Sequence, residues 1–404
     1  MRAGLDPWLL ALCTSRAFMT FVFMTYAAAL PVLREAWQMS ATAAGSISTG
    51  FQAGYAVSLL FFSWLADRVS ARRVYLWSAW LSAAAALAFA LFARSYVSGL
   101  VLYTLVALSQ GGTYTTAIML IADRYPRERR GAAVGWLLAS ASAGYALSLL
   151  VAGLALRAGG YPAAFLATAL GPVLGLATGW VALRSSPNVV HPRPAGAGFG
   201  SEVLRNGPAV RLMLGYTFHS WELLGMWAWT PAFVAAALTA GGVAGVAAVA
   251  QGAYVSAAFH VMGLLAGMTM GRLSDRLGRR DVLVALAAIS TLCSFLFGWL
   301  IGWPAPVIFA VGAVYGFTAL GDSPVLSTAF TEAVSPAYLG SALALRSLLG
   351  FGAGAVAPLV FGAVLDATNP PGVTPPVVWG WAFAVLGLGG AVATACAWGL
   401  PRRR

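Results

Sequence analysis

Residues 271–280 read GRLSDRLGRR and lie between two long apolar stretches of the chain. Each stretch is long enough to cross a bilayer as a helix, which takes about 20 apolar residues. A short basic turn between two such helices is favoured on the cytoplasmic side, where anionic headgroups and the positive-inside bias hold arginine. An acid at a helix end can pair with an arginine or cap a neighbouring helix. The turn therefore predicts a latch between helices, with gating residues Asp275, Arg276, Arg279 and Arg280.

The turn resembles the G-x-x-x-D-R-x-G-R-R signature of the major facilitator superfamily, with every specified position matched. A weaker copy, SWLADRVSARR, occupies residues 63–73, where serines replace both glycines and the basic pair comes one residue later. This copy implies that Asp67 and Arg68 are gating residues. The resemblance covers the whole chain and implies an all-α membrane protein that works by alternating access. It implies twelve transmembrane helices in two pseudo-symmetric six-helix bundles.

The composition indicates a membrane protein. Of the 404 residues, 60% are hydrophobic and 9% are charged, whereas soluble domains carry about 25% charged residues. All 24 basic residues are arginine, and the net charge is +12. Because these arginines border apolar stretches, we expect membrane lipids, and not nucleic acid, as their partner. The 3 cysteines lie in apolar runs without metal-ligand spacing, so neither a metal nor a cofactor is expected.

Loops divide the sequence into apolar runs that are each predicted to span the bilayer. The twelve predicted spans are 8–31, 41–65, 74–93, 97–122, 131–156, 162–183, 210–238, 246–271, 282–301, 306–330, 340–365 and 378–400. A linker rich in proline and glycine, residues 185–208, separates the first six from the last six. This predicts an N-terminal bundle over residues 1–184 and a C-terminal bundle over residues 209–404.

The distribution of arginine predicts the orientation. With both termini inside, nineteen arginines fall in cytoplasmic segments, and only Arg34, Arg94 and Arg157 fall in outer loops. This asymmetry follows the positive-inside rule. We expect a monomeric, multi-pass protein of a bacterial-type inner membrane with both termini in the cytoplasm.

The two halves of the sequence repeat. The two copies of the basic turn are 208 residues apart, and each is followed by an acid at a similar distance. Asp123 comes 56 residues after Asp67, and Glu332 comes 57 residues after Asp275. We therefore expect Asp123 and Glu332 to be equivalent gating residues.

Ionisable side chains inside apolar spans are costly and usually face a cavity or a partner. The repeat offset places Glu222 opposite position 14, close to Arg16, where a site between the halves of such a transporter belongs. His260 and Gln52 are repeat-equivalent, since each lies fifteen residues before the acid of its basic turn. The expected substrate-binding residues are Arg16, Gln52, Tyr55, His219, Glu222, His260 and Arg346. Gln110, Tyr114 and Tyr145 are weaker candidates, and Ala107 stands where related transporters often carry an arginine linked to proton coupling.

Several of these residues have a structural alternative. His219 and Glu222 share a helix face and could form an internally satisfied network. Asp322 comes two residues before a proline and could form a local structural bond to the backbone that the proline breaks. Arg346 could pair with Glu332 and not bind an anion.

These observations favour a secondary transporter of a small solute, and not an enzyme. Two buried arginines favour an organic or inorganic anion, such as a carboxylate, as substrate. Proton coupling is expected at Glu222 or Asp322, because burial favours the neutral form of a carboxylic acid. The alternatives are a drug or metabolite efflux permease and, from another class, a transport-dead membrane receptor or scaffold. The sequence has no Walker motif, which excludes an ATP-driven pump built from this chain alone.

Overall fold

A computed structural model describes residues 6–188, 203–334, 339–370 and 377–402. The side chains of residues 67, 127–132 and 339–341 also lie outside the described part. Within it the chain forms α-helices joined by short turns, and it contains no strand. The predicted all-α fold is confirmed.

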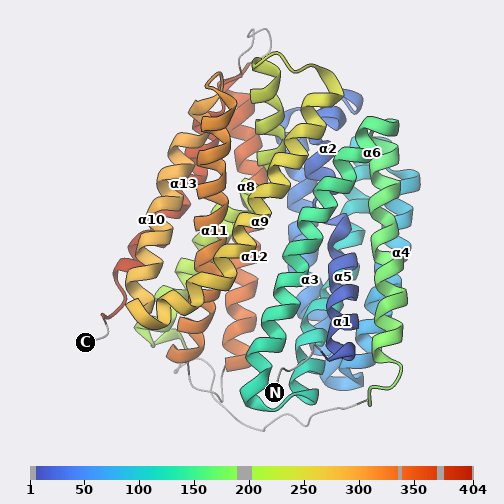
Figure 1. Ribbon diagram of the computed structural model, residues 1–404, viewed down its shortest axis with the longest axis vertical. Coiled ribbons are helices and arrows are strands. Elements are labelled where there is room, and N and C mark those ends of the chain that lie inside the picture. The colour runs from blue at the N-terminus through green and yellow to red at the C-terminus, as the bar shows by residue number, and fades with distance from the viewer. Residues whose placement is uncertain (1–5, 189–202, 335–338, 371–376, 403–404) are drawn as a thin grey trace. The chain divides into compact units, whose positions relative to one another are not determined.

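The chain divides into two compact units. Unit 1 comprises Met1–Ala29 and Gly50–Arg193, and unit 2 comprises Leu30–Thr49 and Pro194–Arg404. Unit 1 holds α1 (Pro7–Met19), the 3-10 turn η1 (Thr20–Val22), α4 (Ala71–Phe92), α5 (Tyr96–Arg124) and α6 (Arg127–Leu183). Two helices, α2 (Thr25–Ala36) and α3 (Ala41–Val69), run from one unit into the other. Unit 2 holds α8 (Gly207–Ala240), α9 (Gly245–Leu277), α10 (Arg279–Phe297), α11 (Ala305–Ala333), α12 (Leu339–Thr368) and α13 (Gly380–Trp398), all labelled in Figure 1.

The first predicted span, 8–31, is broken, because α1 gives way to η1 before α2 begins. Side chains of α5 bond carbonyl groups that the break releases. Gln110 donates to the carbonyl of Met19 at 3.0 Å, and Tyr103 donates to that of Phe23 at 2.6 Å. Unpaired backbone groups are costly away from water, so these donors stabilise the break. Gln110, a weaker cavity candidate from the sequence, thus supports the backbone of α1.

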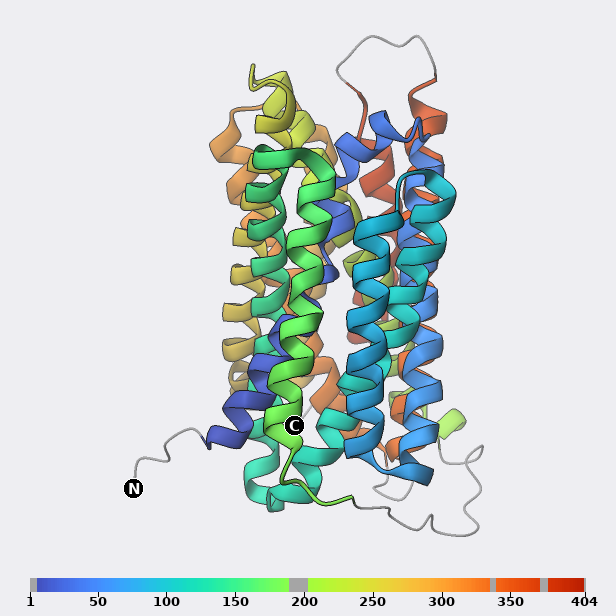
Figure 2. The same cartoon turned by 90° about the vertical axis from the view of Figure 1, so that its right-hand side faces the viewer.

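The long helix α6 contains a reversal. Gly159 and Gly160 leave the helical conformation, and Gly160 has a φ of 67°, which favours glycine. The two limbs on either side correspond to the predicted spans 131–156 and 162–183, and Figure 2 shows both in green.

The basic turn of unit 2 is shorter than the sequence indicated. Residues up to Leu277 continue α9, and α10 begins at Arg279. Gly278 alone separates the two helices, with a φ of 95° that residues other than glycine rarely adopt. The expectation of a ten-residue turn was wrong, because one left-handed glycine is enough to reverse the chain.

The core of unit 2 is aromatic near one end. The ring of Phe383 packs edge to face against those of Phe361, Phe233 and Phe297, with centroids 5.0, 5.2 and 5.3 Å away, and Phe233 lies 4.7 Å from Phe297 in a tilted pair. Edge-to-face pairs of this kind contribute about 0.5–1.5 kcal/mol each beyond the apolar area they bury. These contacts fix α8, α10, α12 and α13 against one another.

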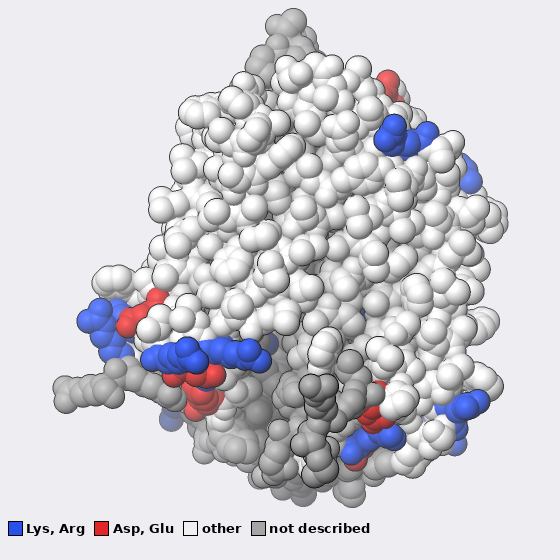
Figure 3. All heavy atoms as spheres, viewed as in Figure 1, with Lys and Arg blue, Asp and Glu red and all other residues white. Residues whose placement is uncertain are grey.

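Ten helical segments of the described residues are long and apolar enough to cross a membrane. One of them, Ala133–Leu183, contains the reversal in α6 and so covers two predicted spans. The helix α3 covers the predicted span 41–65 but is not among the ten, so the count of twelve stays a prediction. On the face shown in Figure 3, charged side chains lie near helix ends and uncharged atoms cover the surface between them. Large apolar side chains are also exposed on the helices, and Trp80, for example, is 61% exposed. Such exposed apolar side chains are suited to contact with lipid.

The start of α1 is fixed by Asp6. Its carboxylate accepts hydrogen bonds from the amide of Trp8 (3.0 Å), the hydroxyl of Tyr125 (2.7 Å) and Nε of Arg124 (3.1 Å). Burial raises the pKa of Asp6, but these three hydrogen bonds outweigh it, and the pKa lies below its ordinary value. Burial and the bond to Asp6 raise the pKa of Tyr125 to about 12.

We expect Asp6→Ala to lower the free energy of unfolding by about 1 kcal/mol through loss of this helix cap. Because the pKa of Asp6 is lower in the folded protein than in the unfolded chain, its contribution to stability is fully present above the unfolded-state pKa. That contribution disappears as the pH falls through the folded-state pKa. Chemical unfolding of the purified protein should therefore show the loss at about pH 7 and little of it near pH 2. Glu35, an exposed acid, provides a control, since Glu35→Ala should change stability by less than about 0.5 kcal/mol. Equal losses for Asp6→Ala at both pH values would contradict the charge-dependent part.

Candidate functional site

Among the described residues of unit 1, Arg16 is the most deeply buried charge, at 2% exposed. Its Nη1 donates to Oγ1 of Thr113 at 3.1 Å, and its Nη2 donates to the hydroxyl of Tyr55 at 3.4 Å. The guanidinium carbon lies 5.1 Å from the ring centroid of Tyr114. Nε is buried with no hydrogen-bond partner. These partners are neutral, and among the described residues no carboxylate lies within salt-bridge distance of Arg16.

The other two predicted residues of unit 1 lie on α3. Tyr55 is buried and contacts Arg16, as described above. Gln52 is half-buried one turn away on the same helix. The structure thus brings Arg16 and Tyr55 together, and no described contact joins Gln52 to either of them.

In unit 2, His219 and Asp322 form a buried pair. Nδ1 of His219 lies 3.0 Å from Oδ1 of Asp322, and Nε2 lies 2.9 Å from Oγ of Ser323. The Nδ1–Oδ1 distance is that of an ion pair, with His219 charged when protonated. The alternative in which Asp322 bonds the backbone freed by Pro324 is wrong, since the described partner of its carboxylate is His219.

Glu222 lies in a cage of hydroxyl groups. Ser290 and Ser294 of α10 both donate to Oε1, at 2.7 and 2.6 Å. Oγ of Ser294 is also 2.5 Å from the hydroxyl of Tyr315 on α11. On the α13 side, Gly390 leaves room for the carboxylate, because a Cβ there would lie only 2.8 Å from Oε2. His219 and Asp322 are within electrostatic reach, so unit 2 gathers three titratable groups.

Arg346 is the second buried cation, at 8% exposed. Its guanidinium carbon lies 4.2 Å from the ring centroid of Tyr216 and 5.3 Å from that of Phe330. Nη1 donates to Oγ of Ser327 at 3.4 Å, and Nε has no hydrogen-bond partner. The alternative pairing of Arg346 with Glu332 is not found, since no ion pair joins these two described side chains and Glu332 pairs with Arg279.

His260 lies at the wall of a cavity in unit 2. Its ring centroid is 5.1 Å from that of Trp227. The cavity is narrow and lies between α8, α9, α10 and α11. A second narrow cavity reaches Asp322 from Arg211 and Leu400, near the ends of α8 and α13.

Three of the predicted gating residues meet at one end of unit 2. Nη2 of Arg279 lies 2.6 Å from Oδ1 of Asp275 and 3.0 Å from Oε1 of Glu332. Nη1 of Arg279 also donates to Oγ of Ser274 at 2.5 Å. One guanidinium at the start of α10 therefore joins the end of α9 to the end of α11.

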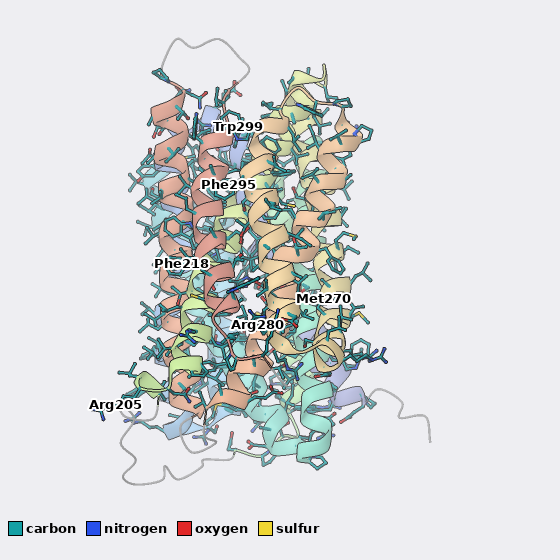
Figure 4. The ribbon with its side chains drawn as sticks, turned by 90° about the vertical axis from the view of Figure 1, so that its left-hand side faces the viewer. Arg205, Phe218, Met270, Arg280, Phe295 and Trp299 are labelled. Atoms are coloured by element: carbon teal, nitrogen blue, oxygen red, sulfur yellow. The ribbon has the colours of Figure 1, made fainter. Side chains whose placement is uncertain are left out.

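The remaining gating candidates are more dispersed. Arg280 bonds the carbonyl of Trp398 at 3.0 Å and lies over its ring, and Figure 4 shows it far along the α10 segment from Trp299. Arg276 is exposed and makes no described contact. Arg68 lies 3.8 Å from the ring centroid of Trp64, and Asp123 is exposed at the end of α5. The side chain of Asp67 lies outside the described residues.

We expect Asp275→Asn to slow transport several-fold while insertion and folding are retained. Asp275 is 61% exposed, and an exposed pair of this spacing contributes only about 0.3–0.5 kcal/mol to stability. The expected effect is therefore on the exchange between conformations that make and break the Arg279 contact. Initial rates of solute flux in proteoliposomes measure it, with Glu35→Gln at an exposed acid of α2 as the control. If correctly inserted Asp275→Asn protein transports solute at the rate of the parent, the latch hypothesis is wrong.

Two contacts at helix ends were not predicted from the sequence. The carboxylate of Asp366, near the end of α12, accepts from the amides of Ala41 and Thr42 at 2.8 and 2.7 Å and caps α3 within unit 2. Asp6 caps α1, as described above. Each acid stands at the edge of an apolar span, which is a signal for capping, but no spacing rule identifies the helix that Asp366 caps.

Long apolar helices with buried, sparsely paired charges define a class of protein, the multi-pass membrane transporters. The sequence profile of the Major Facilitator Superfamily matches residues 12–252 and 245–404. The chain belongs to this superfamily. It is a secondary transporter of small molecules and not an enzyme.

Individual relatives agree with this assignment. The chain is 28% identical over 399 residues to a probable transporter of Streptomyces coelicolor, covering 96% of this chain and 84% of the relative. A nucleoside transporter structure superposes with a TM-score of 0.77 at 14% identity, covering 96% and 98% of the two chains. A D-xylose–proton symporter superposes with a TM-score of 0.75 at 18% identity, covering 98% of each. At these identities the structural likeness establishes the fold alone.

Proposed function

We propose that the protein transports a small organic or inorganic anion, with a carboxylate as the first choice. The observation that carries this proposal is Arg16, a buried guanidinium whose described partners are all neutral. A buried cation without a counter-ion is costly, and an anionic group that binds beside it removes most of that cost. Tyr55 and Thr113 hold the guanidinium from two helices, so it is positioned before the anion arrives.

Arg346 supports the same substrate class. It is buried against two rings and one serine hydroxyl, with Nε free to donate. Each unit thus carries one buried arginine with no carboxylate partner among the described residues. A transporter of neutral solutes has no evident need for two such charges.

The coupling ion that we propose is the proton. Glu222 and Asp322 are both buried, and both lie near His219. Carboxylates in such surroundings can exchange a proton during a transport cycle. A proton taken up with a monovalent anion also makes the transported pair electrically neutral.

We propose that the protein is a monomer in a bacterial inner membrane, with both termini in the cytoplasm. The arginine distribution supports the orientation, and the bacterial relative supports the membrane. The partners that we propose are the transported anion, protons and the surrounding membrane lipids.

Purified protein in liposomes tests the anion proposal. The probes are labelled lactate, benzoate and phosphate, with glycerol and choline as neutral and cationic controls. We expect saturable flux of at least one anion and no flux of either control solute. The same anion should raise the melting temperature of the detergent-purified protein. Flux of a control without flux of any anion would overturn the anion class. Absence of flux for every solute would favour a transport-dead receptor.

A further inference from the structure

A short chain of hydrogen bonds leads away from Glu222 within unit 2. Oγ of Ser294 on α10 donates to Oε1 of Glu222 at 2.6 Å, and the hydroxyl of Tyr315 on α11 lies 2.5 Å from the same Oγ. All three side chains are buried. Because the single hydrogen of the Ser294 hydroxyl is directed at Glu222, the hydrogen between Ser294 and Tyr315 comes from the phenol. The chain therefore has one direction, from the phenol through the serine to the carboxylate.

The phenol of this chain belongs to a residue that also lines the narrow cavity between α8, α9, α10 and α11. The cavity has room for about one water molecule. Since the hydrogen of the Tyr315 hydroxyl is used toward Ser294, its oxygen is left to accept a hydrogen bond. A water molecule in the cavity can donate that bond and so extend the chain beyond Tyr315.

One hydroxyl group at the wall of this cavity has no partner. Thr230 on α8 is 6% exposed, lines the cavity and makes no hydrogen bond through Oγ1. Ser256, at the same wall, instead donates to the carbonyl of Gly252 on its own helix at 2.8 Å. Buried water molecules usually bond polar groups that would otherwise be unsatisfied. Thr230 thus offers a water the anchor that it needs beside Tyr315.

The titratable groups around this chain leave it one proton donor at the cavity. Among the residues that line the cavity, His260 on α9 is the titratable side chain besides Tyr315, and none is a carboxylate or a guanidinium. An imidazole can take up a proton and release it. Next to Glu222 lie His219 on the same helix, Asp322 on α11 and Cys293 on α10. His219 is paired with Asp322, at 3.0 Å.

We propose that a water molecule held by Thr230 completes a proton relay from His260 to Glu222. The inference rests on the proton coupling proposed above and names its route. The His260 imidazolium gives a proton to the water, which passes one to the oxygen of Tyr315. Tyr315 passes its hydroxyl proton to Ser294, and Ser294 passes its own to the Glu222 carboxylate. Each oxygen on the way gains one O–H bond and loses one, so only His260 and Glu222 change their protonation state.

Infrared spectroscopy of the detergent-purified protein tests the route without any anion. The carbonyl band of protonated Glu222 is assigned by its absence in Glu222→Gln, and its shift after transfer to D2O measures exchange of the carboxyl proton. Tyr315→Phe keeps the ring and removes the hydroxyl. We expect it to slow the shift by about tenfold or more, since a positioned proton-transfer group commonly contributes at least that much. Exchange at the parent rate in folded Tyr315→Phe protein would overturn the relay.

Matched variants test the water and its donor. Thr230→Val keeps the side-chain shape and removes the unbonded hydroxyl, so exchange should slow while the melting temperature stays the same or rises. Thr230→Ser should exchange as the parent does, and His260→Gln should be slow. Exchange at the parent rate in Thr230→Val or in His260→Gln would overturn the role of that residue.

Two controls remove hydroxyls that lie outside the relay. Thr239 on α8 donates to the carbonyl of Ala235 at 2.9 Å, and Tyr254 on α9 has a buried hydroxyl that makes no hydrogen bond. Thr239→Val and Tyr254→Phe should exchange at the parent rate. Equal slowing in these controls would show a general effect of hydroxyl loss and would overturn the relay.

The outcomes separate this route from the function that it serves. If no band between about pH 5 and pH 8 is lost in Glu222→Gln, Glu222 holds no exchangeable proton, and both the coupling at Glu222 and the relay are wrong. If the band is present and every relay variant exchanges as the parent does, the relay alone is wrong. If lactate, benzoate and phosphate all fail to move in liposomes while the relay variants are slow, the anion proposal alone is wrong.

Discussion

Arg16→Gln is expected to weaken binding of the transported anion about 100-fold, which corresponds to about 2.7 kcal/mol for one lost charge pair. Glutamine keeps hydrogen-bonding capacity toward Thr113 and Tyr55 but has no charge to offer an anion. Arg16→Lys should weaken binding by about tenfold, because lysine keeps the charge and loses the planar fork. Titration of the purified protein with the anion found by flux measures both effects.

The opposite outcome has its own signature. If Arg16 is structural, Arg16→Gln destabilises the free protein through loss of the contacts between α1, α3 and α5, and anion affinity is unchanged. If Arg16 binds the anion, removal of a buried, uncompensated charge leaves the free protein as stable as the parent or more so. Arg94→Gln, at an exposed arginine of the same unit, is the control and should alter neither quantity. Parent-like anion affinity in folded Arg16→Gln protein would end the anion proposal at this residue.

Much of the fold could be predicted from the sequence because the bilayer restricts what an apolar chain can do. Runs of about 20 apolar residues have to be helices, and a short basic turn between two of them carried the family resemblance. The reversal at Gly278 and the break after Met19 could not be predicted at this detail. Each depends on one backbone conformation or on donors such as Gln110, which come from a distant part of the sequence.

The partners of the buried charges were harder to predict. The sequence did not distinguish between two roles for Arg346, pairing with Glu332 and binding an anion. In the structure, Glu332 pairs with Arg279. Arg279, the first residue of α10, lies near the last residues of α11, where Glu332 is. The guanidinium of Arg346 instead lies over the rings of Tyr216 and Phe330. Periodicity places a residue on a helix face, but partner choice depends on helix rotation and side-chain reach, which spacing alone does not encode.

The pairing of His219 with Asp322 shows the same limit. Both residues were predicted as functional because each is an ionisable group in an apolar span. No sequence pattern linked them across a separation of 103 positions, so Asp322 was given a local backbone partner as its alternative. Their 3.0 Å approach leaves Glu222 as the buried acid without a basic partner in direct contact.

Glu222→Gln is expected to abolish accumulation of the anion driven by a pH gradient while exchange of the anion across the membrane continues. With one proton coupled, a gradient of about one pH unit drives about tenfold accumulation, since one unit corresponds to about 1.4 kcal/mol. The reason lies in the cage around Glu222. Hydroxyls of Ser290, Ser294 and Tyr315 can donate to a carboxylate or accept from a protonated acid, so the cage suits both forms without rearrangement.

Glutamine has the shape of the protonated acid and can bond the same serines, so Glu222→Gln should fold, but it cannot gain or lose a proton. Lumenal pH and labelled anion are followed together in proteoliposomes, with Glu35→Gln as an exposed control that should behave as the parent. If the parent moves anion without any pH change, proton coupling fails altogether. If Glu222→Gln still takes up protons with the anion and Asp322→Asn does not, the exchangeable proton belongs to the pair that Asp322 forms with His219. Loss in Glu222→Gln alone would assign the proton to the serine-lined carboxylate, and the His219–Asp322 contact would then serve to hold α8 against α11.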